Sequence, residues 1–386
     1  MTEWLNTYFS SVEQWLLLAL VLVWIYQLWF YLRYMAGTLR HLRRQRKGKI
    51  ITPIKQPPVS VVICARNEAN NLREYLSAVL EQDYPEYEVI VVNDGSQDDT
   101  QSVLEQYQSL YPNLRLTFVP LNARVRSTKK LALTLAAKAA KYDYLILTDA
   151  DCCPQSKHWI AQLMKGFATD VEIVLGYGAY FREKTVVNSI IQYDTLFNGL
   201  QYLGMAQAHR PYMGVGRNLA YKKEVFFRHN GFTKLMDIKA GDDDLFVNRE
   251  ANKKNTAIMV SPDSITWSVP KKSFANWLHQ KSRHLSVSPH YRLATKIRLT
   301  TEPLTRGLFY ALVIALLAIG SVWAQLSAAV LFALRYVLQI VILNMSARKL
   351  QHQGIIIYQP IAYDILLPLI NLSLMCVNMF KRKQTW

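Results

Sequence analysis

Three clusters of polar and acidic residues each follow a short apolar segment of the chain. Segments 59–65, 88–92 and 144–148 are followed by Arg66-Asn67-Glu68, by Asn93-Asp94-Gly95-Ser96 and by Asp149-Ala150-Asp151. Short, nearly continuous apolar runs are typical of strands buried on both faces of a parallel sheet. Because ligands of such sheets bind beyond the carboxyl ends of the strands, we expect the three clusters to face one ligand-binding rim.

Asp149 and Asp151 have a spacing that suits a divalent metal ion. Residues two apart at a strand end project to the same side, so both carboxylates can reach one Mg²⁺ or Mn²⁺ that bridges a diphosphate. Such an ion keeps waters and binds substrate phosphates, so two carboxylates suffice. Any single acidic residue there can instead cap a helix, and capping is the better interpretation for Asp98 or Asp99, which precede Thr100.

A second acidic feature is the run Ala240-Gly241-Asp242-Asp243-Asp244. Three adjacent aspartates repel one another, which should raise the pKa of at least one of them and favour a proton acceptor. The alternative is a solvated helix start.

The elements that must position these residues form an alternating α/β pattern. Strands are predicted at 59–65, 88–92, 114–119 and 144–148, and helices at 70–82, 100–110 and 129–140. Strands therefore recur about every 28 residues, which indicates βαβ units with right-handed crossovers. The predicted fold is a Rossmann-like α/β sheet domain.

Residues 15–34 are almost wholly apolar or aromatic, and about 20 such residues suffice to span a bilayer as a helix. A removable signal peptide has basic residues before its apolar core, whereas here they follow it, as Arg40, Arg43, Arg44, Arg46, Lys47 and Lys49. We therefore expect a retained anchor with its N-terminus outside and the basic run in the cytoplasm.

Apolar character returns after Arg306. Segments 307–323 and 326–345 are predicted spans joined by a turn at Ala324-Gln325, and segment 355–380 is interrupted by Pro360, Asp364 and Pro368. Four crossings that start outside would leave Lys381, Arg382 and Lys383 outside, against the positive-inside tendency. One segment is therefore expected to lie in the interface or to re-enter the membrane.

The net charge of +17 does not indicate nucleic-acid binding, because the basic residues gather beside the apolar segments. That distribution favours binding to a membrane surface with anionic head groups, and some of these basic residues can also bind a diphosphate. The four cysteines, at 64, 152, 153 and 376, lack zinc-type spacing and are interpreted as reduced cytoplasmic thiols. The sequence carries no signal for an oligomeric state.

The ordered motifs VSVVICARNE, VIVVNDGSQDDT, STKKLAL, LILTDAD, GVGRNLAY, AGDDDLF and QKSRH together resemble glycosyltransferase family 2. The resemblance covers residues 57 to 290 and points to the membrane-bound branch that includes ceramide glucosyltransferases and polysaccharide synthases. It implies a GT-A fold and a nucleoside diphosphate sugar, expected to be a UDP-sugar, as donor.

The resemblance also assigns roles at the donor site. Glu68 and Asp94 would contact the nucleoside, Lys129 or Lys130 would lie near the nucleotide, and Asp149 would approach the ribose and diphosphate beside the metal ligand Asp151. A surface lysine pair and capping carboxylates are the structural alternatives.

Catalytic roles follow from two further motifs of the family. The base of its TED-like motif would be Asp242, with Asp243 as the alternative because the glutamate is missing here. The QxxRW motif is present as residues 280–284, so Gln280 and Arg283 would act on the departing diphosphate. His284 replaces the tryptophan, which should alter either base stacking at the donor site or packing at the acceptor site.

We therefore divide the chain into an anchor at 1–36, a basic linker at 37–56, a GT-A catalytic domain at 57–270, an interfacial helix region at 271–305 and C-terminal membrane or interfacial helices at 306–386. The predicted activity is inverting sugar transfer to a membrane-associated acceptor, with a lipid preferred over a glycan and the catalytic domain in the cytoplasm. A polysaccharide synthase subunit and a non-catalytic nucleotide-binding membrane protein are the alternatives.

Overall fold

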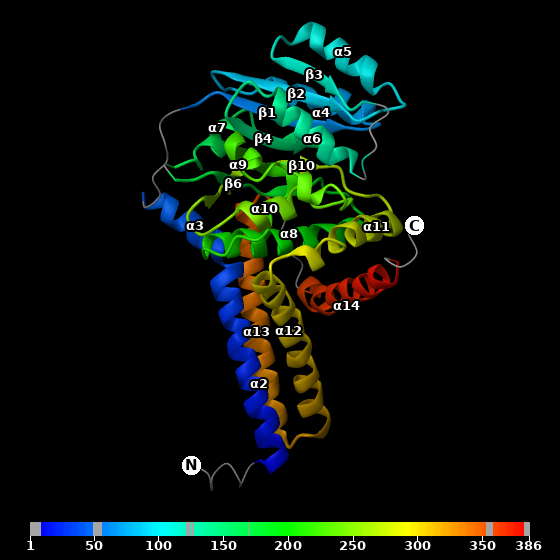
Figure 1. Ribbon diagram of the computed structural model, residues 1–386. Helices are drawn as coiled ribbons and strands as arrows, with labels where there is room; N and C mark the ends of the chain where they lie inside the picture. Colours follow the sequence, from blue (N-terminus) through cyan, green and yellow to red (C-terminus); the bar gives the residue numbers. More distant parts are fainter. Residues whose placement is uncertain are drawn as a thin grey trace.

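The computed structural model describes residues 9–48, 56–120, 125, 127–168, 170–352 and 358–381. An α/β domain stands on a bundle of long helices (Figure 1). Of the basic residues discussed above, Lys49, Arg382 and Lys383 lie outside the described part of the chain.

The centre of the α/β domain is a seven-stranded sheet with the strand order β3-β2-β1-β4-β8-β6-β9. Strands β1 (Val59–Ala65), β2 (Tyr87–Asn93), β3 (Leu114–Phe118) and β4 (Tyr144–Asp149) run parallel. Strand β8 (Leu219–Lys222) is antiparallel to β4 and to β6 (Ile173–Leu175), and β9 (Thr256–Ile258) is parallel to β6. The sheet is therefore mixed, as the GT-A resemblance implies, and its parallel half carries the predicted rim.

Helices cover both faces of this sheet. Val59, Val61 and Ile63 of β1 share a core with α4 (Ala69–Leu80), α5 (Thr100–Leu110) and α7 (Trp159–Met164). Val62 of the same strand packs in a second core with α6 (Thr128–Ala139). Alternate strand residues enter opposite cores, which explains the unbroken apolar run of β1.

A small second sheet and several short helices complete the domain. The sheet contains β5 (Cys152–Pro154), β10 (Thr266–Ser268) and β7 (Gly178–Tyr180) in that order. The short helices are η2 (Gly216–Asn218), α9 (Lys223–Arg228), η3 (Thr233–Leu235), α10 (Asp244–Glu250) and η4 (Pro262–Ser264).

The long helix α8 (Val186–Gln207) joins the domain to the N-terminal helical segment. That segment comprises α2 (Ser11–Phe30) and the π-helical turn η1 (Tyr31–Met35), and α3 (Gly37–Arg46) follows it. A Cβ atom on Gly204 of α8 would lie 1.8 Å from the carbonyl oxygen of Tyr34. The close approach of α8 to η1 therefore requires glycine at this position.

Four described helices are long and apolar enough to cross a membrane: the α2–η1 segment, α12 (Leu293–Ile319), α13 (Val322–Lys349) and α14 (Tyr358–Lys381). The turn between α12 and α13 lies at Gly320-Ser321, so its prediction at Ala324-Gln325 was wrong. Ser321 caps α13 by accepting a hydrogen bond from the Ala324 amide, and the apolar residues Val322 and Trp323 inside the first turn concealed this start.

The region expected to form one interfacial helix divides into two. Helix α11 (Phe274–Leu285) is followed by the single turn η5 (Ser288–His290) before α12 begins at Leu293. Pro289 lies in that turn, and a proline interrupts helical hydrogen bonding. Helix α11 therefore belongs to the α/β domain, while α12 continues into the bundle (Figure 1).

Candidate active site

The sheet register brings the predicted strand-end residues to one rim. Cys64 on β1 pairs with Asp149 on β4, and Ala65 pairs with Asn93 on β2. Asp94 follows directly and is buried, with its carboxylate accepting a 2.6 Å hydrogen bond from the Thr128 hydroxyl. The first turn of α6 thus lies against the end of β2 and presents Lys129 to the rim.

Lys129 lies between two carboxylates from distant parts of the chain. Its ammonium nitrogen is 3.0 Å from Asp149 and 3.2 Å from Asp242. Burial acts to lower the pKa of Lys129, but the carboxylates of Asp149, Asp242 and Asp243 outweigh it and raise the pKa well above the usual value. Lys129 is therefore a permanent cation in a recess that Asp149 and Asp242 also line.

Lys130, the neighbouring candidate, points elsewhere. Its side chain is fully buried, and its ammonium group donates hydrogen bonds to the carbonyl oxygens of Leu235, Ile238 and Ala240. Successive helical residues project about 100° apart, so only one of the two lysines can face the recess. Lys130 holds the segment that leads to Asp242, whereas Lys129 contacts Asp242 itself.

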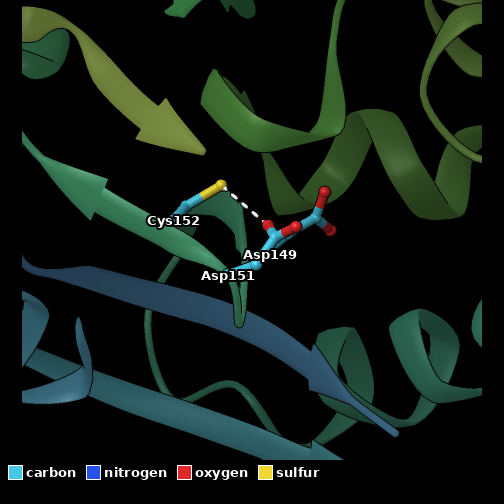
Figure 2. A group of neighbouring side chains, drawn as sticks. All are labelled: Asp149, Asp151 and Cys152. Carbon is cyan, nitrogen blue, oxygen red and sulfur yellow. Dashed lines mark hydrogen bonds between the residues drawn. The ribbon is translucent and has the colours of Figure 1, made fainter. Parts of the chain in front are cut away.

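Asp149, Asp151 and Cys152 form a compact group whose potential ligand atoms lie within 4.8 Å of one another (Figure 2). The Asp151 carboxylate accepts hydrogen bonds from the Ser268 hydroxyl at 3.0 Å and from the Cys152 thiol at 3.4 Å. Burial, followed by the charges of Asp151 and Asp149, raises the pKa of the Cys152 thiol well above its usual value. The hard ligands of the group are therefore the two carboxylates, which fit Mg²⁺ or Mn²⁺.

Arg217, in the GVGRNLAY segment, is a functional candidate that the sequence analysis did not single out. Its guanidinium group lies 4.1 Å from the ring centroid of Tyr180 and donates a 3.0 Å hydrogen bond to the carbonyl oxygen of Ala179. Burial raises the pKa of Asp151, and the Arg217 charge acts against that rise. The available signal was that a buried acidic pair needs a nearby cation, but the sequence does not say which arginine supplies it.

Only one of the three consecutive aspartates faces Lys129. The Asp243 carboxylate accepts hydrogen bonds from the amides of Gly216 at 2.7 Å and Asp244 at 2.8 Å. Asp244 accepts one from the Tyr291 hydroxyl at 2.9 Å. Asp242, with 15% of its side chain exposed, is left to pair with Lys129.

The three carboxyl groups also differ in pKa. Burial acts to raise the pKa of Asp242, but the Lys129 charge outweighs it, and the net pKa is below the usual value. Burial and neighbouring carboxylates raise the pKa of both Asp243 and Asp244. The pKa rise expected from like-charge repulsion thus falls on Asp243 and Asp244, whose carboxyl groups already accept hydrogen bonds within the domain. Asp242 remains as the ionised proton acceptor at the recess.

Helix α11 carries the predicted QxxRH residues to the same side of the domain. The Gln280 side-chain amide donates a 3.2 Å hydrogen bond to the Tyr180 hydroxyl, the same ring that contacts Arg217. The side chains of Arg283 and His284 are exposed. Desolvation and the charges of Arg283 and Arg217 act to lower the pKa of His284, and because the side chain is exposed, the two arginine charges are the effect that the geometry supports.

Glu68 occupies the end of the rim nearest α4. Its carboxylate accepts a 2.5 Å hydrogen bond from the Asn71 amide, and its backbone amide donates one to the Thr100 hydroxyl at 2.9 Å. Burial, with a contribution from the Asp151 charge, raises its pKa. The Asp98 carboxylate accepts hydrogen bonds from the amides of Ala69 and Thr100, the first residues of α4 and α5, whereas Asp99, at the N-cap position of α5, makes no capping hydrogen bond with its side chain.

The predicted residues thus differ in position. Lys129, Asp149 and Asp242 line the recess, Asp151 lies beside Asp149, and Glu68 and Asp94 extend the same rim. Gln280 reaches it through Tyr180, and His284 interacts electrostatically with Asp242 and Lys129. Lys130 and Asp243 bind the backbone around the site instead.

Residues 60–229 match the family model described as Glycosyl transferase family 2. Similar curated proteins include the probable glycosyltransferase YdaM of Bacillus subtilis (strain 168), 26% identical over 69% of this chain and 64% of its own length. The glycosyltransferase AglE of Haloferax volcanii is 32% identical over 31% of this chain and 39% of its own length. A poly-beta-1,6-N-acetyl-D-glucosamine synthase of Staphylococcus epidermidis is 36% identical over 24% of this chain and 21% of its own length. The chain thus spans less than two thirds of each of these relatives.

Among solved structures, the mannosyltransferase PcManGT from Pyrobaculum calidifontis, in complex with GDP-Man and Mn²⁺, is similar over 94% of this chain and 99% of that chain. The TM-score is 0.58 and the sequence identity is 22%. The likeness extends over the α/β domain and the helices beside it, and it shows a shared fold.

Proposed function

Since this chain belongs to glycosyltransferase family 2, we propose that it transfers a sugar from a nucleoside diphosphate donor, with inversion, to an acceptor at the membrane. The observation that carries the proposal is the position of Lys129 between Asp149 and Asp242. This position supports a single reaction centre, in which the strand-end residues that would bind the diphosphate lie beside a carboxylate that can accept a proton.

In the proposed reaction Asp242 takes the proton of the acceptor hydroxyl. The acceptor oxygen then forms a bond to the anomeric carbon, and the bond from that carbon to the diphosphate oxygen breaks on the opposite face. The electron pair of the broken bond leaves with the nucleoside diphosphate. This single displacement inverts the anomeric configuration, and it requires Asp242 to be ionised beforehand, which the lowering of its pKa by Lys129 supports.

Cationic side chains would stabilise the leaving group. Arg217 lies among Asp151, Tyr180 and the second sheet, and the exposed Arg283 can bind phosphate oxygens as a planar fork. A divalent cation held by Asp149 and Asp151 would neutralise part of the diphosphate charge. The solved relative that binds GDP-Man and Mn²⁺ supports this class of donor and ion, and the rim residues Glu68 and Asp94 are proposed to contact the nucleoside.

The proposed location is the cytoplasmic membrane, with the α/β domain in the cytoplasm. Four helices of sufficient length and apolarity support membrane association, and the basic residues of α3 support the cytoplasmic side. Because four apolar helices adjoin the α/β domain, we propose a lipid as acceptor. The catalytic domain predicted at residues 57–270 stays part of this proposal, with α11 assigned to it and α12 assigned to the helix bundle.

A polysaccharide synthase is the second candidate, because one similar protein is named as a synthase of poly-beta-1,6-N-acetyl-D-glucosamine. That match covers 24% of the chain and 21% of the synthase, so it does not decide between the two acceptors. The two candidates differ in their product: a lipid-soluble product from single transfer supports the first, and a long lipid-free polymer supports the second.

The test is a screen of nucleotide release from membranes that contain the full chain. UDP-sugars and GDP-sugars are supplied with Mn²⁺ and membrane lipid, and the expected result is lipid-dependent release of one nucleoside diphosphate with label in the lipid fraction. Membranes that bind nucleotide but release none with any donor would indicate the non-catalytic alternative and contradict the proposal.

A further inference from the structure

Helix α14 satisfies the length and composition of a membrane span, yet its placement is unlike that of the other three candidates. Helices α2, α12 and α13 run side by side as a bundle away from the α/β domain (Figure 1). Helix α14 lies crosswise to one side of this bundle, near the end closest to the α/β domain, and beneath α11 (Figure 1), which it contacts.

The two faces of α14 differ in chemistry. Its buried residues include Gln359, Tyr363 and Asp364. Its exposed residues are mostly apolar and include Ile361, Ile365, Leu366, Leu369, Leu372, Met375, Val377, Met379 and Phe380, with Ser373 as a polar exception. A row of exposed apolar side chains of this length is unfavourable in water and is typical of a surface that contacts lipid.

The beginning of α14 is anchored where the bundle meets the α/β domain. Asp364 is fully buried and accepts hydrogen bonds from Arg306 of α12 at 2.7 Å and from Arg335 of α13 at 2.9 Å. The Tyr363 hydroxyl lies 3.0 Å from the Ser189 hydroxyl of α8. Both anchors hold this end of α14 at the level of α8.

The end of α14 is anchored to the QxxRH helix. The Ser282 hydroxyl of α11 donates a 2.7 Å hydrogen bond to the Asn378 side chain, whose amide donates a 2.9 Å bond to the Ser282 carbonyl oxygen. Asp364 and Asn378 are about 21 Å apart along the axis, at 1.5 Å per residue. A helix that descended through the bilayer would carry Asn378 that far from the domain, and this pair of bonds could not form.

We propose that α14 does not cross the membrane but lies in the plane of the bilayer surface, with its exposed apolar face in the lipid of the leaflet next to the α/β domain. The partner of this face is the lipid surface itself, which the adjacent helices α2, α12 and α13 enter. The chain then crosses three times, and its C-terminus is on the side of the α/β domain. Because Ser282 precedes Arg283, the lipid surface also sets the position of the helix that carries Arg283.

The first test compares the two ends of the full chain. Cleavable tags at either end are exposed to protease in sealed vesicles whose outward side is identified by cleavage within the α/β domain. The expected result is that the C-terminal tag is cleaved together with the α/β domain while the N-terminal tag is protected. If both tags were protected, the two ends would lie on the side opposite the α/β domain. The chain would then cross the membrane four times, and the proposal would be overturned.

A cysteine pair tests the position of α14 independently of catalysis. In a Cys376→Ser background, Ser282→Cys with Asn378→Cys is expected to form a disulfide on oxidation in membranes. Ser282→Cys with Phe380→Cys is the matched control, because Phe380 is exposed on the outer face, and it should remain reduced. No disulfide in the first pair, or equal formation in both, would contradict the placement of α14 beneath α11, whether or not the chain transfers sugar.

Discussion

The Lys129 ammonium group lies 3.2 Å from the carboxylate of Asp242, although one belongs to the first turn of α6 and the other to the loop before α10. The contact fixes the acidic loop at the end of the parallel sheet. It also keeps Asp242 ionised within a partly buried recess, since the Lys129 charge outweighs the effect of burial on the pKa. The proposed proton acceptor therefore depends on a residue from the donor side of the site.

Asp242→Asn should abolish transfer while nucleotide binding persists. The amide cannot accept the proton of the acceptor hydroxyl, and general-base catalysis contributes about 10²- to 10⁴-fold to a rate. Transfer and nucleotide affinity are measured in the same membranes. Asp243→Asn is the matched control: its amide oxygen can still accept the bond from the Gly216 amide, so a smaller loss is expected. Equal losses in the two variants would argue against Asp242 as the base.

Lys129→Met should move the acid limb of the transfer rate to higher pH. The active form of Asp242 is the carboxylate, and its lowered pKa keeps it active as the pH falls below the usual aspartate range. Without the Lys129 charge, burial and the Asp243 carboxylate raise the pKa, so protonation occurs at higher pH. The rate is measured from pH 4 to 8 at saturating donor, with Lys129→Arg as the control that retains the charge. If the acid limb were unchanged in Lys129→Met, the group that titrates in the rate profile would not be Asp242.

Asp151→Asn should weaken Mn²⁺ binding, because it removes one of the two carboxylate charges in the Asp149, Asp151 and Cys152 group. Ser268→Ala removes a 3.0 Å hydrogen bond to Asp151, and loss of such a supporting contact typically costs about 10- to 100-fold in metal affinity. Free Mn²⁺ is measured by electron paramagnetic resonance in the presence of nucleoside diphosphate, without any turnover. Wild-type affinity in Asp151→Asn would place the ion elsewhere.

Gly204→Val should destabilise the junction between α8 and the N-terminal helical segment. A Cβ atom at Gly204 would lie 1.8 Å from the Tyr34 carbonyl oxygen, and overpacking of this kind typically costs about 1–3 kcal/mol or more. Thermal unfolding in detergent measures the loss. Gly307→Ala in α12 is the control, because no atom lies within 4 Å of its added Cβ, and it should leave the unfolding temperature unchanged or raise it.

The parallel half of the sheet followed from the sequence because burial on both faces leaves an unmistakable pattern. Strand β1 has the predicted bounds, and β2 and β4 differ by one residue at their ends. The same rule placed Asp94, Asp149 and Asp151 at one rim. The short strands β5, β6, β7, β9 and β10 have three residues each, too few for a periodic signal, and they were not predicted.

Within the site, residue type and order could not distinguish neighbours. Lys129 and Lys130 are equivalent in the sequence, and the carbonyl oxygens that bind Lys130 come from a loop more than one hundred residues later. The role of Asp243 likewise depends on the Gly216 amide. Arg217 was overlooked because a single arginine in a turn becomes informative only beside the acidic pair it faces.

The membrane helices show the limit of hydropathy. Helix α14 has the composition of a span, and composition does not record which neighbours a helix contacts. The local signal was Asp364, since a charged residue in an apolar segment requires a buried partner. Its partners Arg306 and Arg335 come from two other helices, so their convergence could not be deduced from spacing.

The anomeric configuration of the product tests the central claim most directly. After the donor has been identified, the transferred sugar is analysed by nuclear magnetic resonance before any secondary exchange. A single displacement with Asp242 as base predicts a product whose configuration is opposite to that of the donor. Retention of the donor configuration would require a different reaction at this centre and would contradict the account.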